Sequence, residues 1–254
     1  MVTGCTVTLA RGSEHSLATD CAPARVNRGR RGRTIPAWRL RPWIALLAVG
    51  IALALPARAA DWQVIAERDG IVVSRKSVAG RGFPQLRAVG EVPGTPYEIL
   101  AVLLDVPAHT KWLPDCVESR TLRHLDAWHH VIYTRTDAPW PVSDREAVIE
   151  NEVIFLEPPS RLKVTFMALP APEVARARGT VRMKAVSGYY LIAAIDDRRS
   201  LVQYELDADP AGALPAWLVS FQSTRNPMQT LSGLRARLQA TRGQYRAQIA
   251  TFPR

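Results

Sequence analysis

The chain has 254 residues, of which 47% are hydrophobic and 22% charged, an ordinary composition for a globular protein with one sizeable core or two small ones. Its formal net charge of +10 is concentrated in residues 1–60, which carry nine arginines against two acids, whereas residues 61–254 carry 24 Lys+Arg against 21 Asp+Glu. Because the basic excess belongs to a leader and not to a binding face, the composition argues against a nucleic-acid-binding protein.

Residues 1–60 have the order of a secretory leader. Arginines precede an apolar run of 13 residues at positions 43–55, and small residues follow at Ala57, Ala59 and Ala60. A charged region, a short apolar region and a small-residue cleavage site are typical of a signal peptide. The run is shorter than the ~20 residues that span a bilayer as a helix. We therefore predict an exported protein with one folded domain at 61–254; an uncleaved membrane anchor is the alternative.

Cysteine usage fits an exported chain that needs no disulfide. Cys5 and Cys21 lie in the leader, which leaves Cys116 alone in the folded part. Its neighbours offer no basic partner or helix start that would activate the thiol as a nucleophile. We expect a partly buried structural thiol.

The folded part is predicted to begin with three strands and a short helix. Residues 62–78 alternate apolar and polar on both sides of Asp69-Gly70, a strong hairpin turn pair, and residues 85–92 follow as a third strand. The stretch 95–98 (TPYE) is a capping box with proline at the first helical position, so a helix is expected there. A short helix or turn is expected at 107–114.

Six further segments look like strands, bounded by breaks rich in Pro, Gly and Asp. They cover residues 118–125, 129–138, 146–157, 161–169, 180–196 and 200–209. Their short connections suit antiparallel neighbours.

The chain ends in a long predicted helix. It opens after Pro215 and continues with Leu231, Leu234 and Leu238 at three- and four-residue spacing. Asn226-Pro227 is expected to kink or split it, because proline removes a backbone donor and clashes one turn back.

Together these elements predict an α+β fold in which one curved antiparallel sheet wraps around the C-terminal helix. So many strands enclose more volume than one helix fills, yet protein interiors are densely packed. Either large side chains or a bound ligand must complete the interior.

Four stretches carry a resemblance to a known family: 61–76 (DWQVIAERDGIVVSRK), 131–148 (VIYTRTDAPWPVSDREAV), 179–192 (GTVRMKAVSGYYLI) and 207–222 (DADPAGALPAWLVSFQ). They contain an aromatic and a Gly-Ile step, then aromatic-Pro-x-Ser-x-Arg followed by an acid, then Asp-Pro-x-Gly with Pro-x-Trp-Leu. In this order and over essentially all of 61–245, the chain resembles the START (steroidogenic acute regulatory protein-related lipid transfer) domain. The resemblance implies a helix-grip fold, a hydrophobic tunnel, one bound lipid or sterol, no catalysis and no cofactor.

Arg145 matches the family's motif arginine, which in several members faces the cavity and helps to hold a polar lipid head. Strand alternation places Asp144 and Glu146 on the face opposite to Arg145. The partner of Arg145 must then come from another strand or from the ligand, since an unpaired buried charge is costly. A structural ion pair that holds the turn at Trp140 is the alternative. Glu146 stands where the family often has aspartate.

Arg135 stands where relatives are often acidic or neutral. If it faces inward, the head-group chemistry favours an anionic ligand; if it faces outward, it is a solvated strand charge. Tyr133 shares the face of Arg135, because one residue separates them in a strand.

Further ligand contacts are expected from aromatic and apolar side chains. Trp140 anchors the turn in the middle of the chain, and Tyr204 lies on the apolar face of its strand. Trp217, Leu218 and Phe221 lie on the first turns of the last helix, which the resemblance makes a lid over the lipid. For each of them, ordinary core packing is the alternative.

The leading functional prediction is a monomeric lipid or sterol carrier, exported to the periplasm of a Gram-negative bacterium, with transient contact to a membrane surface. Release of the ligand needs an opening, expected at Asn226-Pro227 and in the loop 169–179. The rival is a polyketide cyclase or aromatase, in which Arg145, Tyr133 and a histidine or carboxylate converge for acid-base chemistry. A third alternative is an envelope interaction protein whose cavity is filled.

Other site types find little support in the sequence. It contains no H-E-x-x-H, P-loop, G-x-S-x-G or G-x-G-x-x-G motif. His129 and His130 are expected on opposite faces of a strand, so they do not form a pair of metal ligands. We therefore predict no metal site.

Overall fold

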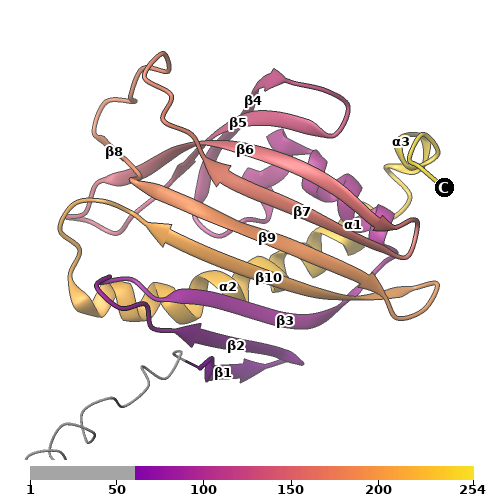
Figure 1. Ribbon diagram of the computed structural model, residues 1–254, viewed down its shortest axis with the longest axis horizontal. Helices are drawn as coiled ribbons and strands as arrows, with labels where there is room; N and C mark the ends of the chain where they lie inside the picture. Colours follow the sequence, from indigo (N-terminus) through magenta and orange to yellow (C-terminus); the bar gives the residue numbers. More distant parts are fainter. Residues whose placement is uncertain (1–60) are drawn as a thin grey trace, which may run out of the picture. The chain divides into compact units, whose positions relative to one another are not determined.

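The computed structural model describes residues 61–254, and the leader predicted for 1–60 lies outside them. Ten strands form one sheet (Figure 1). They are β1 (Gln63–Arg68), β2 (Ile71–Lys76), β3 (Gln85–Pro93), β4 (Cys116–His124), β5 (His129–Thr136), β6 (Asp144–Glu157), β7 (Arg161–Ala168), β8 (Thr180–Arg182), β9 (Ala185–Ala194) and β10 (Arg199–Asp209). The spatial order is β1-β2-β3-β10-β9-β7-β6-β5-β4, so that the third strand pairs with the last.

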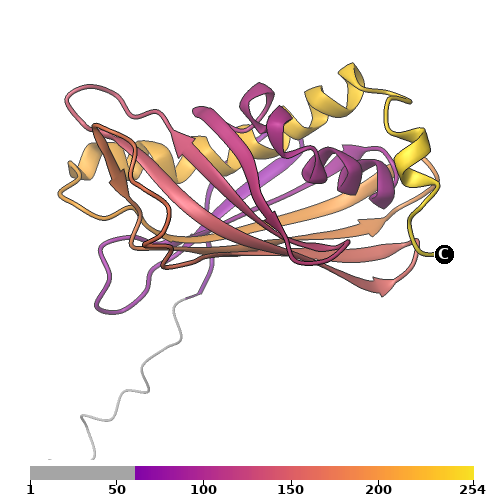
Figure 2. The same ribbon diagram turned by 90° about the horizontal axis from the view of Figure 1, so that it is seen from above.

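Within the described residues, four helical segments accompany the sheet. They are α1 (Pro96–Leu104), the 3-10 turn η1 (Val106–Lys111), α2 (Ala216–Ala240) and α3 (Arg246–Ile249). Figure 2 shows that the long helix α2 and the helix α1 lie on the same side of the curved sheet. Neighbouring strands along the main path are antiparallel. The predicted α+β helix-grip fold is confirmed.

Local sequence signals explain the first elements. Asp69 and Gly70 join β1 and β2 with positive φ angles of 51° and 68°, which a tight hairpin turn of this kind requires. The capping box of α1 is complete: the Thr95 N–H donates to Glu98 Oε2 at 2.8 Å, and the Glu98 N–H donates to Thr95 Oγ1 at 3.3 Å.

The predicted continuous strand at 180–196 is wrong, because the chain changes partners inside it. β8 pairs with β6 in parallel, whereas β9 pairs with β7 and β10. The change occurs between Met183, whose N–H donates to the carbonyl of Glu146, and Lys184, whose N–H donates to the carbonyl of Asp209. Alternation in the sequence continues through this switch and therefore does not reveal it.

Of the two outcomes expected at Asn226-Pro227, a kink or a split of the last helix, the split is wrong, since α2 runs unbroken through Pro227. Leu231, Leu234 and Leu238, which follow the proline, are buried in the main core and hold this half of the helix against the sheet. Tertiary packing thus outweighs the lost backbone hydrogen bond.

Two negative findings concern the described residues 61–254 only. None of their helices has the length and apolar character needed to cross a membrane. In the same range, no three or more His, Cys, Asp or Glu side chains are grouped as metal ligands would be.

Candidate functional site

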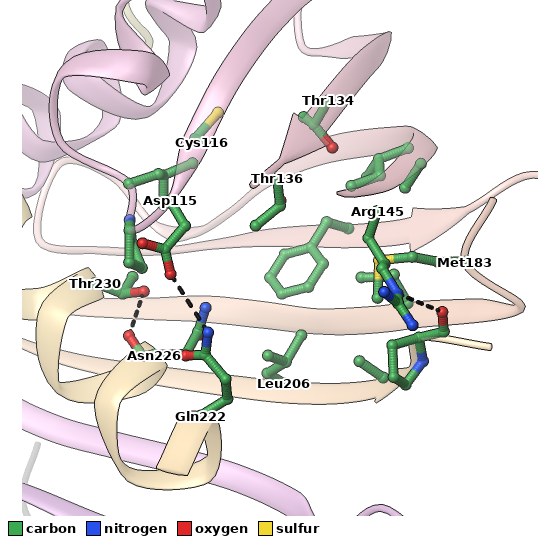
Figure 3. A pocket seen from close by; sticks show the side chains of 18 of the residues that line it. Asp115, Cys116, Thr134, Thr136, Arg145, Met183, Leu206, Gln222, Asn226 and Thr230 are labelled. Atoms are coloured by element: carbon green, nitrogen blue, oxygen red, sulfur yellow. Dashed lines mark hydrogen bonds between the residues drawn. The ribbon is translucent and has the colours of Figure 1, made fainter. Parts of the chain in front are cut away.

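A cavity of about 340 Å³ lies between the sheet and the N-terminal half of α2 (Figure 3). Its walls come from β3, β4, β5, β6, β7, β9 and β10, from α1 and η1, and from the first four turns of α2. Apolar and aromatic side chains dominate the lining, among them Phe166, Tyr190 and Tyr204, whose ring centroids lie 4.8–6.1 Å apart. Such a volume falls within the ~300–1,000 Å³ typical of small-molecule sites.

The residues of α2 explain why the interior is hollow at one end. Its second half places Leu231 and Leu234 in the core, fully buried. Its first four turns instead place Gln222, Asn226 and Thr230 toward the cavity at four-residue spacing, on one helix face. These shorter or polar side chains leave the space that leucines fill further along the helix.

Three connections between elements line one end of the cavity, here called its mouth. Phe83 comes from the β2–β3 connection, Pro139 from the β5–β6 connection and Leu214 from the β10–α2 connection. A second pocket of about 550 Å³ shares Phe83 and Leu214 with the cavity, so the two spaces adjoin there. Arg75 and Arg81 line this outer pocket.

Arg145 marks one side of the cavity. It is 8% exposed, and its guanidinium donates to the backbone carbonyls of Ser143, Pro210 (3.3 Å) and Ala211 (3.2 Å). Figure 3 shows it beside Met183, turned toward this carbonyl-bearing loop. Arg145 therefore links β6 to the connection that leads into α2.

A second polar group lies on another side of the cavity, across from Arg145 in Figure 3. Asp115 accepts hydrogen bonds from both terminal nitrogens of Arg225, one of them at 2.9 Å, and a weaker one from Gln222 Nε2 at 3.4 Å. Within the described residues, Gln222 Oε1, Asn226 Oδ1 and Trp112 Nε1 are buried without a hydrogen-bond partner.

Two histidines line the cavity in their neutral form. Burial lowers the pKa of His109 to about 4; its Nε2–H donates to the carbonyl of Leu103 at 2.9 Å, and the Ser119 hydroxyl lies 3.4 Å from its Nδ1. Burial likewise lowers the pKa of His130. Burial also raises the pKa of the Cys116 thiol to about 11, as expected for a structural cysteine and not for an activated nucleophile.

Three of the predicted ligand-binding residues line the cavity: Arg145, Tyr204 and Leu218. They come from β6, β10 and α2 and are all buried. The structure thus brings together one cation, one aromatic ring and one aliphatic side chain from distant parts of the sequence.

The assignment of Tyr133 and Arg135 to the ligand site needs correction, since neither lines the cavity. Both lie on the outer face of β5. Arg135 forms ion pairs there with Asp144 (3.0 Å) and Glu118 (3.4 Å). The outward alternative for Arg135 is therefore the one that the structure shows.

Tyr133 belongs to a buried network on the same outer face, centred on Glu146. The Tyr133 hydroxyl and the Ala177 N–H donate to Glu146 Oε2 at 2.8 and 2.9 Å, and Arg182 donates to Oε1 at 2.9 Å. Burial by itself raises the pKa of Glu146, but the hydrogen bonds from Ala177, Tyr133, Thr180 and Arg182 outweigh it and lower that pKa. The network fastens the 169–179 loop to the outside of the sheet.

The remaining predicted contacts, Trp140, Trp217 and Phe221, are also absent from the cavity lining and lie on the surface. Their residues are 91%, 60% and 54% exposed. Trp140 projects from the β5–β6 connection, and the other two lie on the outer side of the first turns of α2. Each of the three is next in sequence to a residue that does line the cavity, namely Pro139, Leu218 and Gln222, respectively.

Several cavity residues were missed by sequence reasoning. His130, Thr134 and Thr136 occupy the inward positions of β5, and Asn151 lies further along β6. The four-residue spacing of Gln222, Asn226 and Thr230 was the one available signal on α2, because it places three polar side chains on a single helix face.

The group of residues expected for a cyclase or aromatase does not assemble as predicted. That alternative required Tyr133 beside Arg145 in the cavity, but Tyr133 lies on the opposite face of the sheet and donates to Glu146. Arg145 and the buried histidines do line the same cavity.

Comparison with known proteins agrees with this architecture. Residues 52–243 match the START domain. Protein PA1579 of Pseudomonas aeruginosa is 28% identical over 193 residues, which cover 75% of this chain and 93% of that protein. The phosphatidylcholine transfer protein of Mus musculus is 24% identical over 168 residues, covering 64% of this chain and 76% of its own.

A solved structure shows the same fold. The STAR-related lipid transfer protein fragment from Xanthomonas axonopodis has a TM-score of 0.64 and 26% identity, covering 70% of this chain and 98% of that fragment. Since the family match extends over most of the chain and the sheet grips its last helix as in this relative, the protein belongs to the START domain family.

Proposed function

We propose that this protein binds one lipid or sterol in the cavity and carries it between membranes as a monomer, without catalysis. The observation that carries the proposal is the hollow itself, an apolar and aromatic space beneath α2 that the protein's own side chains leave open. Its membership of a family that includes lipid transfer proteins supports the same conclusion. Burial of apolar ligand surface supplies about 25 cal/mol per Å², enough for tight binding without a covalent step.

Native mass spectrometry of the purified protein tests ligand binding directly. We expect a defined mass increment that disappears on organic extraction, and a lipid or sterol in the extract. A protein without adduct, which also fails to take up lipid from vesicles, would contradict the proposal.

A cavity-filling substitution should remove the ligand while leaving the fold intact. Ala208 lies on the inward face of β10 and lines the cavity. In Ala208→Phe the added ring occupies ligand space, and we expect the lipid-bound fraction to fall about tenfold, since one displaced apolar contact is worth about 1.5–3 kcal/mol.

Leu201→Phe is the matched control for that substitution. Leu201 lies on the same strand but faces outward and is 43% exposed. The lipid-bound fraction of Leu201→Phe in the native mass spectrum should equal that of the wild type. Unchanged lipid content in Ala208→Phe, with a folded circular dichroism spectrum, would place the ligand elsewhere.

The exposed aromatic side chains support transient docking of the mouth on a membrane surface. Trp140 and Trp217 flank connections that line the mouth, and tryptophan prefers the boundary between water and lipid. We expect the double variant Trp140→Ser/Trp217→Ser to bind vesicles that contain phosphatidylglycerol more weakly than the wild type. Its partition coefficient between water and vesicles should be lower by about tenfold or more. Leu201→Ser, which removes an exposed apolar side chain from the outer face of β10, should partition like the wild type. Equal partitioning of all three proteins would exclude the mouth as the docking surface.

We further propose that the protein is exported to the periplasm, on the strength of the leader at 1–60. Cell fractionation and N-terminal sequencing should find a soluble periplasmic chain that starts near residue 61. Recovery in the membrane fraction with the leader intact would support the anchored alternative, and a cytoplasmic chain would contradict export.

A further inference from the structure

Hydrogen-bond acceptors without donors gather on the cavity side of α2. Gln222, Asn226 and Thr230 share one helix face and line the cavity, and Figure 3 shows their side chains there. Thr230 is satisfied within the helix, since its hydroxyl donates to the backbone carbonyl of Asn226 at 2.9 Å. The side-chain oxygens Gln222 Oε1 and Asn226 Oδ1 differ from it, because no donor among residues 61–254 bonds to them.

The orientation of the Gln222 amide follows from its neighbour. Its Nε2 donates a weak hydrogen bond to Asp115 Oδ2 at 3.4 Å, and a carboxylate accepts hydrogen bonds but donates none. The nitrogen therefore belongs on the side of Asp115, which leaves Oε1 as the unpaired acceptor. The Asn226 amide turns about a broad terminal torsion, so its oxygen reaches a ligand at little cost.

Pro227 adds a third acceptor to the same stretch of helix. In an α-helix, each carbonyl accepts from the N–H four residues later. The carbonyl of Ser223 would accept from residue 227, but proline has no N–H to donate. Ser223 lines the cavity and is only 6% exposed, so little solvent is available to replace the missing donor. We call Gln222 Oε1, Asn226 Oδ1 and the Ser223 carbonyl the acceptor strip.

The acceptor strip is costly by itself and selective toward a ligand. A buried oxygen without a donor has lost its hydrogen bond to water and received nothing in exchange. The other half of α2 avoids this cost, because it places Leu231 and Leu234 in the core. A ligand group that donates a hydrogen bond removes the cost, whereas a plain hydrocarbon leaves it in place.

Trp112 supplies a donor beside the same helix. It lines the cavity, and its Nε1 is buried without an acceptor among the described residues. Its backbone packs against α2, since a Cβ at Gly233 would lie 2.2 Å from the Trp112 carbonyl oxygen. A hydroxyl both donates and accepts, so the acceptor strip and Trp112 together match it. The strip consists of uncharged oxygens, and the nearby Asp115 is already paired with Arg225, which suits a neutral group and not a cation.

We propose that the ligand carries a neutral hydroxyl group that donates to the acceptor strip on α2, while its apolar part lies against Phe166, Tyr190 and Tyr204. The proposal rests on the lipid-binding function and narrows it from lipids in general to those with a free hydroxyl, such as a sterol or a long-chain alcohol. It also gives Asn226-Pro227 a role in recognition: one residue contributes an acceptor, and the other leaves a carbonyl free.

An alcohol and its methyl ether differ in the one hydrogen that the acceptor strip would receive. The delipidated protein is incubated with equal amounts of 1-hexadecanol and its methyl ether, and in a second sample with cholesterol and its methyl ether. Native mass spectrometry gives the fraction of protein occupied by each compound. We expect the alcohol to exceed its ether at least about tenfold in each mixture that binds, because leaving buried acceptors without a donor costs about that factor.

Two variants remove members of the acceptor strip by different means. Asn226→Leu deletes an acceptor, and Pro227→Ala supplies the N–H that the Ser223 carbonyl lacks while it improves the helix propensity. In each variant the ratio of alcohol to ether should fall below about threefold. Gln229→Leu is the matched control, because Gln229 lies on the exposed side of α2, and it should retain the wild-type ratio. If Asn226→Leu fails to fold, Pro227→Ala still decides the question.

The outcomes separate this proposal from the broader one. Equal occupancy by alcohol and ether in the wild type would overturn the hydroxyl-bearing ligand and leave lipid binding intact. A preference of the wild-type size that persists in both variants would overturn the role of α2. The lipid extracted from the purified protein should itself carry a free hydroxyl, and an extract of lipids without one would contradict the proposal. Occupancy by none of the four compounds, together with an extract free of lipid, would count against lipid binding itself.

Discussion

Removal of the Glu146 side chain is expected to destabilise the protein by about 3 kcal/mol, because it leaves the charge of Arg182, whose side chain is only 14% exposed, without its acidic partner. Glu146 is 1% exposed and accepts hydrogen bonds from Tyr133, Ala177 and Arg182. Glu146→Ala removes all of these at once and leaves the 169–179 loop held by the hydrogen bonds from Arg182 to the carbonyls of Ala171 and Val174. Urea unfolding followed by circular dichroism measures the loss.

Glu157→Ala is the control for that substitution. Its pair with Arg161 is solvent-exposed, with the side chain of Glu157 65% exposed, and surface pairs contribute at most about 1 kcal/mol. Losses of equal size in the two variants would show that the Glu146 network is no more than a surface contact.

The contribution of Glu146 should also depend on pH in a defined direction. The pKa of a glutamate in the unfolded chain is about 4.3. The pKa of Glu146 in the folded protein is lower than that. The stabilisation is therefore fully present at neutral pH and is lost as the pH falls through the lowered folded pKa. The difference in unfolding free energy between wild type and Glu146→Gln should be constant from pH 6 to 8 and shrink below about pH 4.

A methyl group at Gly233 is expected to cost about 3 kcal/mol, although alanine is the better helix former. A Cβ at this position would lie 2.2 Å from the carbonyl oxygen of Trp112, a backbone atom that cannot rotate away. The clash outweighs the gain of about 1 kcal/mol that Gly→Ala brings to a helix interior. Thermal unfolding of Gly233→Ala should show a Tm lower by about 6–12 °C.

Ser232→Ala provides the matched comparison, since Ser232 is the exposed neighbour on the same helix. There the helix propensity of alanine acts alone, and the Tm should stay within about 2 °C of the wild type. A stabilised Gly233→Ala would mean that α2 does not pack against the Trp112 carbonyl as closely as described.

Strand β6 shows what alternation in a sequence predicts well. Arg145 and Glu146 were expected on opposite faces, and they are: Arg145 lines the cavity, and Glu146 lies in the outer network. This succeeds because a strand has a two-residue period whatever packs against it.

Strand β5 shows where the same reasoning fails. Alternation correctly grouped Tyr133 with Arg135, but it does not say which face of the strand points inward. Ala171 and Val174 from the 169–179 loop cover the outer face, so Val131 and Tyr133 are buried there as fully as a core residue. The apolar or aromatic character of a residue on β5 therefore does not show whether its side chain lines the cavity.

The sequence by itself determined the periodic and local features: the strand alternation, the Asp69-Gly70 turn, the capping box of α1, the amphipathic final helix and the motif around Arg145. These depend on neighbours within a few residues, whose chemistry can be read directly. Only the tertiary structure decided that β8 joins β6, that α2 continues through Pro227 and which face of β5 lines the cavity. It also decided that no acid within residues 61–254 forms an ion pair with Arg145. Each of these depends on residues far apart in the chain, whose distances arise only when the sheet closes around the helix.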